Sequence, residues 1–307
     1  APSDLKMIKK LFFLFFLFWV GFVQGQDTTP IAKYPFQTDA TYQSQIKILE
    51  ERYESTKTIQ VLDSLANLAF EYKDWETAMN YGQKAVELQP SAKRHFLLGG
   101  AAGFRALEVS IFSSLKYINI MKPAFVEAVR LDPSNVFYLR AQVDVLVALP
   151  SLLGGDLGGA LKIIEKIKFI DPLEGLLAEG SFYEKTKDSA RTNEIYQRVF
   201  EFLEQTYPRC SELFFDYLKS NRRDLAYDLG RIAADYNLSP VWGQCALSYF
   251  EETRRLRDTV PLAWVYYQRA RLAKRTEDEK EMERYLKKSL AISKAYPELQ
   301  NLIKTVR

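Results

Sequence analysis

The sequence predicts an all-α protein built as a solenoid of helical hairpins, and two observations lead to this expectation. First, apolar residues recur with helical spacing over most of the 307 residues, and no stretch alternates as a half-buried β-strand does. Second, residues 65–90 end at Pro90 and contain small residues at Ala66, Ala78 and Ala85, so that successive positions lie 12, 7 and 5 residues apart. Small residues let helix backbones approach closely, and proline ends a helix.

This spacing resembles a tetratricopeptide repeat, in which two antiparallel helices form a unit of about 34 residues. One such unit cannot bury its apolar face alone, so further units are expected beside it. The resemblance implies a right-handed superhelix with a concave groove. It indicates architecture better than function, because arrays of this kind serve many binding tasks.

Residues 1–25 are predicted to be a secretory signal peptide with an extension ahead of Met7. Lys9 and Lys10 precede an apolar run over residues 11–23. That run is shorter than the about 20 residues that cross a membrane, which favours cleavage over retention as an anchor. We therefore expect an exported protein, periplasmic in a bacterium or secreted, with no stable membrane span after cleavage.

The next residues are expected to form an extended segment that leads into the array. Residues 26–38 hold two prolines and show no helical period. The array itself is predicted over residues 39–307, as a tetratricopeptide-like solenoid of about six helical hairpins.

The first elements of the array are the clearest. A helix over residues 39–54 carries apolar residues on one face. The clear repeat follows, with helices over residues 58–72 and 75–88. Asp74 precedes the second of these helices and is expected to cap its N-terminus.

The second unit is longer than the first. Its closing sequence, Asp132 and Pro133, arrives about ten residues later than the repeat period predicts. Either both helices exceed the usual length, or residues 110–122 add a turn. Pro123 is expected to begin or kink the second helix.

The remaining units follow by periodicity. The third covers residues 135–172, and Asp156 in its connecting segment can cap the helix that follows. The fourth has its second helix over residues 195–203, and residues 211–218 and 225–236 make a weaker fifth pair. The array is completed by residues 241–257, 261–274 and 278–296.

The charge balance gives no sign of a nucleic-acid surface. The full chain has a formal net charge of +3, of which the predicted leader carries +2. The remaining chain is therefore close to neutral, and no nucleic-acid partner is expected. The basic cluster of Arg254, Arg255 and Arg257 is predicted to be a solvated helix face.

Catalysis is not expected, because the chemistry-bearing residues form no known constellation. The chain holds a single histidine, His95, at a position that packs in a repeat. No metalloprotease, nucleophile-elbow or phosphate-loop motif is present, and one histidine with two distant cysteines makes no tetrahedral metal site. A non-enzymatic protein without cofactor or metal is predicted, and a hydrolase is disfavoured.

Two cysteines leave two alternatives open. Cys210 and Cys245 lie about one repeat period apart, and equivalent positions in neighbouring repeats are usually ~10 Å apart. A disulfide needs Cα atoms within about 7 Å. Separate buried thiols are therefore favoured over a disulfide, although export would permit the bond.

The resemblance implies that peptide contacts come from fixed positions on the first helix of a repeat. In the clear repeat these positions include Asp63, Asn67 and Phe70. Repeats that hold a C-terminal carboxylate resemble one another in having lysine and then asparagine four residues later. Here Asp63 replaces that lysine and would repel a carboxylate. A protein or peptide partner of another kind is therefore predicted.

A second candidate site lies in the following first helix. Phe96, Gly100, Gly103 and Phe104 would floor a partly apolar pocket for a small ligand or an inserted side chain. Each glycine inside a helix costs about 1 kcal/mol relative to alanine, so a gain must offset it. The alternative, which is slightly favoured, is close docking of a neighbouring helix.

Residues 149–160 carry a second resemblance. Their Pro-x-x-x-Gly-Gly-Asp turn into a helix is similar to exported repeat proteins associated with tripartite substrate-binding transporters, their T component. That resemblance implies a small-molecule binder that assists a transporter. The main prediction is a scaffold that engages a protein or peptide through its concave face.

Overall fold

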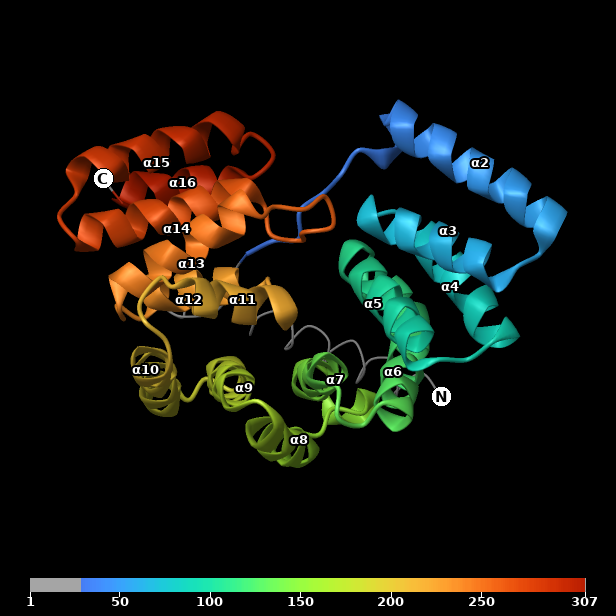
Figure 1. The fold of residues 1–307 in the computed structure, drawn as a ribbon, viewed down its shortest axis with the longest axis horizontal. Coiled ribbons are helices and arrows are strands. Elements are labelled where there is room, and N and C mark those ends of the chain that lie inside the picture. Colours follow the sequence, from blue (N-terminus) through green and yellow to red (C-terminus); the bar gives the residue numbers. More distant parts are fainter. Residues whose placement is uncertain (1–28, 307) are drawn as a thin grey trace, which may run out of the picture.

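The structure is a computed structural model that describes residues 29–306, and these residues are helical without any strand (Figure 1). The signal peptide predicted over residues 1–25 lies outside the described residues. Within residues 29–306, none of the helices combines the length and the apolar character that a membrane crossing requires.

The helices follow one another with short connections. In chain order they are η2 (Phe36–Thr38), α2 (Ala40–Thr56), α3 (Ile59–Glu71), α4 (Trp75–Leu88), α5 (Ala92–Glu108), α6 (Ile111–Leu131), α7 (Val136–Ala148), η3 (Ser151–Leu153), α8 (Leu157–Ile170), α9 (Pro172–Lys185), α10 (Ser189–Thr206), α11 (Glu212–Ser220), α12 (Leu225–Asp235), α13 (Pro240–Glu252), α14 (Leu262–Arg275), α15 (Glu279–Ile292) and α16 (Pro297–Val306).

Aspartate side chains fix several of the helix starts. The Asp74 carboxylate accepts a hydrogen bond from the backbone N–H of Thr77 at 3.1 Å, and Asp156 accepts one from Gly159 at 2.9 Å. Both predicted caps are thereby confirmed. Such a cap satisfies a donor that the first helical turn leaves unpaired.

Successive helices pack in pairs, so the chain is an all-α, tetratricopeptide-like solenoid of helical hairpins, as predicted. The pairs are α3 with α4, α5 with α6, α7 with α8, α9 with α10, α12 with α13, and α14 with α15. Figure 1 shows α5 and α7 on the inner side of the arc and α6 and α8 on its outer side.

The fifth pair differs from the prediction. Residues 211–218 and 225–236 are helical, but α12 packs against α13 and α14 instead of pairing with α11. Two glycines explain why α12 packs against α13. A Cβ on Gly230 would collide with Leu247 of α13, and a Cβ on Gly243 would lie 2.6 Å from Ala233 of α12. Only glycine therefore permits this close approach of α12 and α13.

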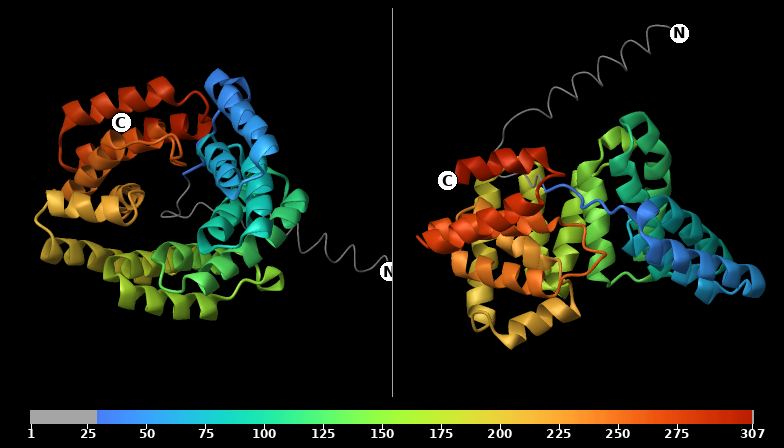
Figure 2. Two further views of the ribbon diagram at one scale, coloured as in Figure 1. Left: turned by 45° about the vertical axis from the view of Figure 1, so that its right-hand side comes forward. Right: turned by 90° about the horizontal axis from the view of Figure 1, so that it is seen from above.

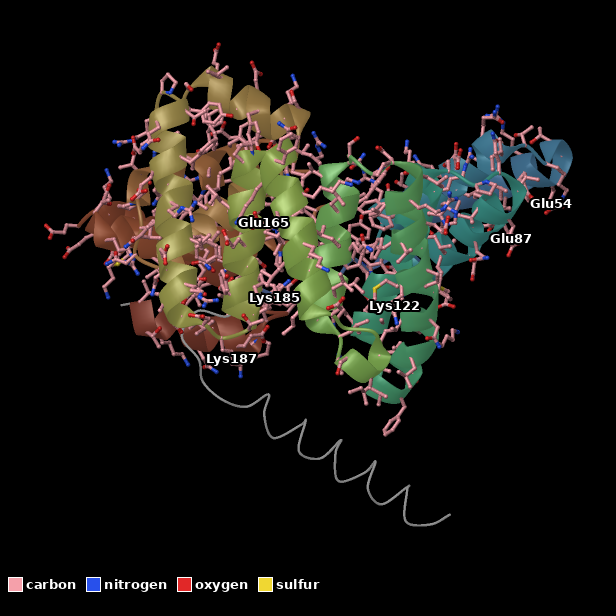
Figure 3. The ribbon with its side chains drawn as sticks, turned by 90° about the horizontal axis from the view of Figure 1, so that it is seen from below. Glu54, Glu87, Lys122, Glu165, Lys185 and Lys187 are labelled. Carbon is pink, nitrogen blue, oxygen red and sulfur yellow. A yellow bond between two sulfur atoms is a disulfide. The ribbon has the colours of Figure 1, made fainter. Side chains whose placement is uncertain are left out.

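Three further helices refine the prediction. α5 has 17 residues and α6 has 21, so both helices of the second unit are long, and Pro123 lies within α6 and does not begin it. Lys122, labelled in Figure 3, donates a hydrogen bond from α6 to the carbonyl of Leu153 in η3. α16 was not predicted, and it buries Leu299 and Ile303 in the core of the C-terminal half.

The array bends until its two ends meet (Figures 1 and 2). Residues 29–38 run from the C-terminal hairpins to α2, beside the loop that joins α13 to α14. The backbone N–H of Ala32 donates to the carbonyl of Thr259 at 2.6 Å, and Lys73 Nζ donates to the carbonyl of Leu256. We call residues 29–38, 72–74 and 253–261 together the clasp.

The structure joins Cys210 to Cys245 in a disulfide, with Cα atoms 5.7 Å apart. The expected separation of ~10 Å assumed equivalent helical positions in adjacent repeats. Cys210 instead lies in the connection between α10 and α11, in the left-handed region at φ 58°. That connection brings its side chain to α13.

Candidate functional site

Two of the three predicted partner-binding residues line a cavity on the N-terminal hairpins. Asp63 and Asn67 are one turn apart on α3, and the cavity between α3, α4 and α5 has a volume of about 100 Å³. Its lining comprises Asp63, Ala66, Asn67, Gly82, Ala85, Ser91, Lys93, Arg94 and Leu97.

Small residues create the space. Ala66 and Ala85 are buried, and a Cβ placed on Gly82 would lie 3.3 Å from Leu97 Cδ2. The residues that let α3 and α4 pack closely therefore also leave room below the polar groups.

The charge on Asp63 is compensated by a residue that follows it by 31 positions. Arg94 Nε and Nη2 each donate to a different Asp63 carboxylate oxygen at 2.8 Å, and Arg94 Nη1 donates to the carbonyl of Gln89 at 2.8 Å. The hydrogen bonds to Asp63 raise the pKa of Arg94. Because of this paired arginine, the predicted repulsion of a carboxylate by Asp63 is largely offset.

Two other polar side chains at the cavity differ, since Asn67 is held by a hydrogen bond and Lys93 has no ion-pair partner within residues 29–306. Asn67 Nδ2 donates to the carbonyl of Asp63 at 2.7 Å, which fixes the direction of its amide. Lys93 is exposed and has no carboxylate within ion-pair distance among residues 29–306. The cavity rim therefore carries one unpaired positive charge.

Phe70, the third predicted contact, lies outside the cavity. Its ring centroid is 5.1 Å from that of Trp75 and 5.9 Å from that of Phe104. The Arg257 guanidinium, from the clasp, lies 5.9 Å from the centre of the Phe70 ring. Phe70 is thus the point where the candidate binding face meets the clasp.

The four predicted pocket residues are not brought together. Phe96 belongs to a different aromatic cluster from Phe104, since its ring lies 5.5 Å from Phe125 and 4.8 Å from Tyr138. Phe104 instead stacks on Trp75 at 4.6 Å. Phe96 and Phe104 therefore belong to two separate aromatic clusters.

The glycines of α5 serve close packing. A Cβ on Gly100 would lie 3.3 Å from the Phe70 ring, and a Cβ on Gly103 would lie 3.0 Å from Met121 Sδ. These neighbours belong to α3 and α6, so the two glycines face different helices. Gly100 and Gly103 therefore fit the alternative expectation, which is close docking of a neighbouring helix. A larger side chain at either position would press on an aromatic ring or a thioether.

His95 is half-buried on α5. Burial lowers the pKa of its imidazole, with Glu127 and Arg130 as the charged neighbours. Within the described part of the chain, no three histidine, cysteine or acidic side chains are grouped so that they could hold a metal ion.

Sequence reasoning missed Lys93 and Arg94, although a signal was present. These residues open α5, and the stacking of consecutive units places the start of one first helix beside the middle of the preceding one. The clasp had no such signal, since its partners lie more than 180 residues apart.

No protein-family model matches the chain, and no curated protein matches it either. Among solved structures, a tetratricopeptide repeat protein from Parabacteroides merdae is 10% identical over 88% of this chain and 94% of its own, with a TM-score of 0.49. PilW, a type IV pilus biogenesis factor, is 15% identical over 80% of this chain and 98% of its own, with a TM-score of 0.42. Yeast Tom70 is 15% identical over 88% of this chain and 59% of its own, with a TM-score of 0.44.

Likeness at this level transfers no partner or activity to this chain. The packing of its own hairpins makes it a helical-repeat protein, and the stacked units of such proteins present extended binding surfaces.

Proposed function

We propose that this protein is a non-enzymatic, exported scaffold that binds an extended segment of a protein partner across α3 and α5. The observation that supports the proposal best is the cavity beside Asp63 and Asn67. It combines space, a fixed amide and an unpaired lysine at positions where repeat proteins contact peptides.

The size of the cavity favours a protein segment over a free small molecule. Ligand sites usually enclose about 300–1,000 Å³, whereas this cavity has a volume of about 100 Å³. That volume accepts the end of one side chain, and the rest of the segment would lie across the helices. Phe96 and Phe104, the two phenylalanines of the alternative apolar pocket, pack in different aromatic clusters, which favours the protein segment over a transporter-associated small molecule.

The polar groups at the cavity fix the direction of a bound group. Asn67 has an amide held by the Asp63 carbonyl, and the bidentate pair between Asp63 and Arg94 holds the two helices in register. A preorganised site of this kind loses little conformational entropy on binding. Lys93 adds one charge-assisted donor at the rim.

The test begins with the protein purified under crosslinking from its own cell envelope. Native mass spectrometry would identify a stoichiometric partner and the mass at which the N-terminus is processed. Binding of that partner is then measured for wild type and for the double variant Asn67→Ala, Lys93→Ala. We expect the variant to bind at least about tenfold more weakly, because it removes two polar contacts of about 1 kcal/mol each.

Lys166→Ala is the control, since Lys166 is exposed on α8, away from the cavity. It should bind as wild type does. Equal binding by wild type and the double variant would contradict the proposed site. A co-purifying small molecule without any protein partner would contradict the proposed function.

A further inference from the structure

The loop between α13 and α14, residues 253–261, is held in one shape by a buried arginine. Arg223 is 7% exposed, and its Nε donates to the carbonyl and the hydroxyl of Thr253 at 2.8 and 2.9 Å. Its two Nη atoms reach the two Asp258 carboxylate oxygens at 3.0 and 2.6 Å. The first residue of the loop and Asp258 are therefore tied to the same guanidinium.

Three other arginines project from this fixed loop without an acidic partner. Arg254, Arg255 and Arg257 are exposed, and none of them has a carboxylate within ion-pair distance in the described part of the chain. The acid inside the loop, Asp258, is occupied by Arg223 and also accepts from the Arg255 backbone N–H at 2.9 Å. The outward charge of the loop is thus uncompensated.

The clasp places this charge at one end of the proposed binding face. Arg257 lies over the ring of Phe70, and the Leu256 carbonyl accepts a hydrogen bond from Lys73. Phe70 follows Asn67 by three residues, which is a rise of about 4.5 Å along α3. A segment that leaves the cavity along α3 therefore arrives at the loop within one helical turn.

The sequence alone favoured a solvated helix face for these arginines. The structure differs, because residues 253–261 form a loop and not a helix. Arg223 holds this loop from within, and the hydrogen bond from the Ala32 N–H to the Thr259 carbonyl holds it to the N-terminal segment. Three like charges within four residues repel one another, and a fixed loop prevents them from moving apart. An acidic partner would relieve that repulsion and meet a loop whose backbone is already held in place.

We propose that residues 253–257 are a recognition loop for an acidic segment of the protein partner. Aspartate or glutamate carboxylates of that segment pair with Arg254, Arg255 and Arg257, while a neighbouring side chain enters the cavity beside Asn67. This inference rests on the proposed function, and it adds the chemical class of the bound segment.

The test uses a fluorescent peptide of alternating glutamate and serine, with a matched peptide of glutamine and serine. Anisotropy titrations compare wild type with the triple variant Arg254→Gln, Arg255→Gln, Arg257→Gln. We expect wild type to prefer the glutamate peptide by at least about tenfold at low salt, with the preference falling as NaCl is added. The triple variant should lose that preference.

Lys162→Gln, Lys166→Gln, Lys280→Gln is the matched control, because it removes the same charge from exposed lysines on α8 and α15. It should keep the preference for the glutamate peptide. Circular dichroism checks that both triple variants keep the helical content of wild type.

Three results would overturn the inference. The first is that wild type shows no preference for the glutamate peptide. The second is that the matched control loses this preference as much as the triple loop variant does. The third is that wild type binds vesicles of phosphatidylserine and phosphatidylcholine more tightly than it binds the peptide. The purified partner separates the two proposals. If Asn67→Ala, Lys93→Ala weakens partner binding while the triple loop variant does not, the scaffold stands and the recognition loop fails.

Discussion

At the scale of single residues, the pair of Asp63 and Arg94 decides the electrostatics of the cavity. The Asp63 side chain is 35% exposed and that of Arg94 is 16% exposed, so the pair is only partly hydrated. Arg94→Met would leave the carboxylate without its bidentate donor. We expect a loss of about 1–3 kcal/mol in the free energy of unfolding, measured by urea denaturation.

The double variant Asp63→Asn, Arg94→Met supplies the control. Because it removes both charges, it should be less destabilised than the sum of the two single variants. Additive effects would mean that the two side chains stabilise the fold independently.

Lys73 predicts a pH dependence. It is 5% exposed at the left-handed turn between α3 and α4, and burial lowers its pKa from 10.5 to about 8, with Glu71, Arg254 and Asp258 as charged neighbours. Between pH 8 and 10.5 the unfolded chain binds more protons at this residue than the folded chain does. Lys73 therefore makes folding more favourable as pH rises through that window, by up to about 3 kcal/mol.

The measurement compares wild type with Lys73→Met by urea denaturation at several pH values from 7 to 10.5. Below pH 8 the lysine is protonated in both states, so the difference between the proteins should be constant. Above pH 8 the free energy of unfolding of wild type should increase relative to that of Lys73→Met. A constant difference over the whole range would contradict burial of the Lys73 ammonium.

At the scale of elements, the disulfide fixes α11 relative to α13. Cys210 and Cys245 are separated by 35 residues, and closing a loop of that length stabilises a fold by about 3–4 kcal/mol in the chain-entropy view. We expect a reductant to lower the urea midpoint of wild type. The variant Cys210→Ser, Cys245→Ser should start lower and should not respond to reductant.

Most elements could be predicted because their signals are local. Asp74 and Asp156 mark the N-termini of two helices, and the apolar periodicity predicts how far each helix extends. The pairing of α12 with α13 could not be predicted in this way. It depends on which neighbour meets Gly230 and Gly243, and that is a property of the packed array.

The candidate site also contains some residues that the sequence predicted and others that it did not. Asp63 and Asn67 follow from repeat positions, and they do line a cavity. Arg94 changes the charge of that cavity from the next unit, and Arg257 reaches Phe70 from the far end of the chain. The contact of Arg94 with Asp63 needs only the stacking of neighbouring units, whereas the contact of Arg257 with Phe70 needs the curvature of the whole array, which no short pattern encodes.

At the scale of the whole molecule, the clasp holds the two ends of the array together. It uses the bond between the Ala32 N–H and the Thr259 carbonyl, and the bond between Lys73 and the Leu256 carbonyl. Each is worth about 1 kcal/mol net, so Ala32→Pro with Lys73→Met should raise the open population about tenfold or more.

Small-angle scattering should then give a larger radius of gyration, and amide exchange should quicken in residues 253–261. Lys47→Met is the control, since Lys47 is exposed on α2. Helical content should stay unchanged in both variants. Scattering curves that superimpose on wild type would show that the ends stay together without these two bonds.

Closure also limits how such a chain can change its length. An open solenoid can gain or lose a hairpin, because each unit contacts only its neighbours. Here Lys73 meets Leu256 only if the hairpins between them sweep one particular arc (Figure 2). Duplicating or deleting one hairpin would change the length of that arc and carry the two ends past each other. The number of hairpins is therefore fixed by geometry, much as the number of strands is fixed in a closed barrel.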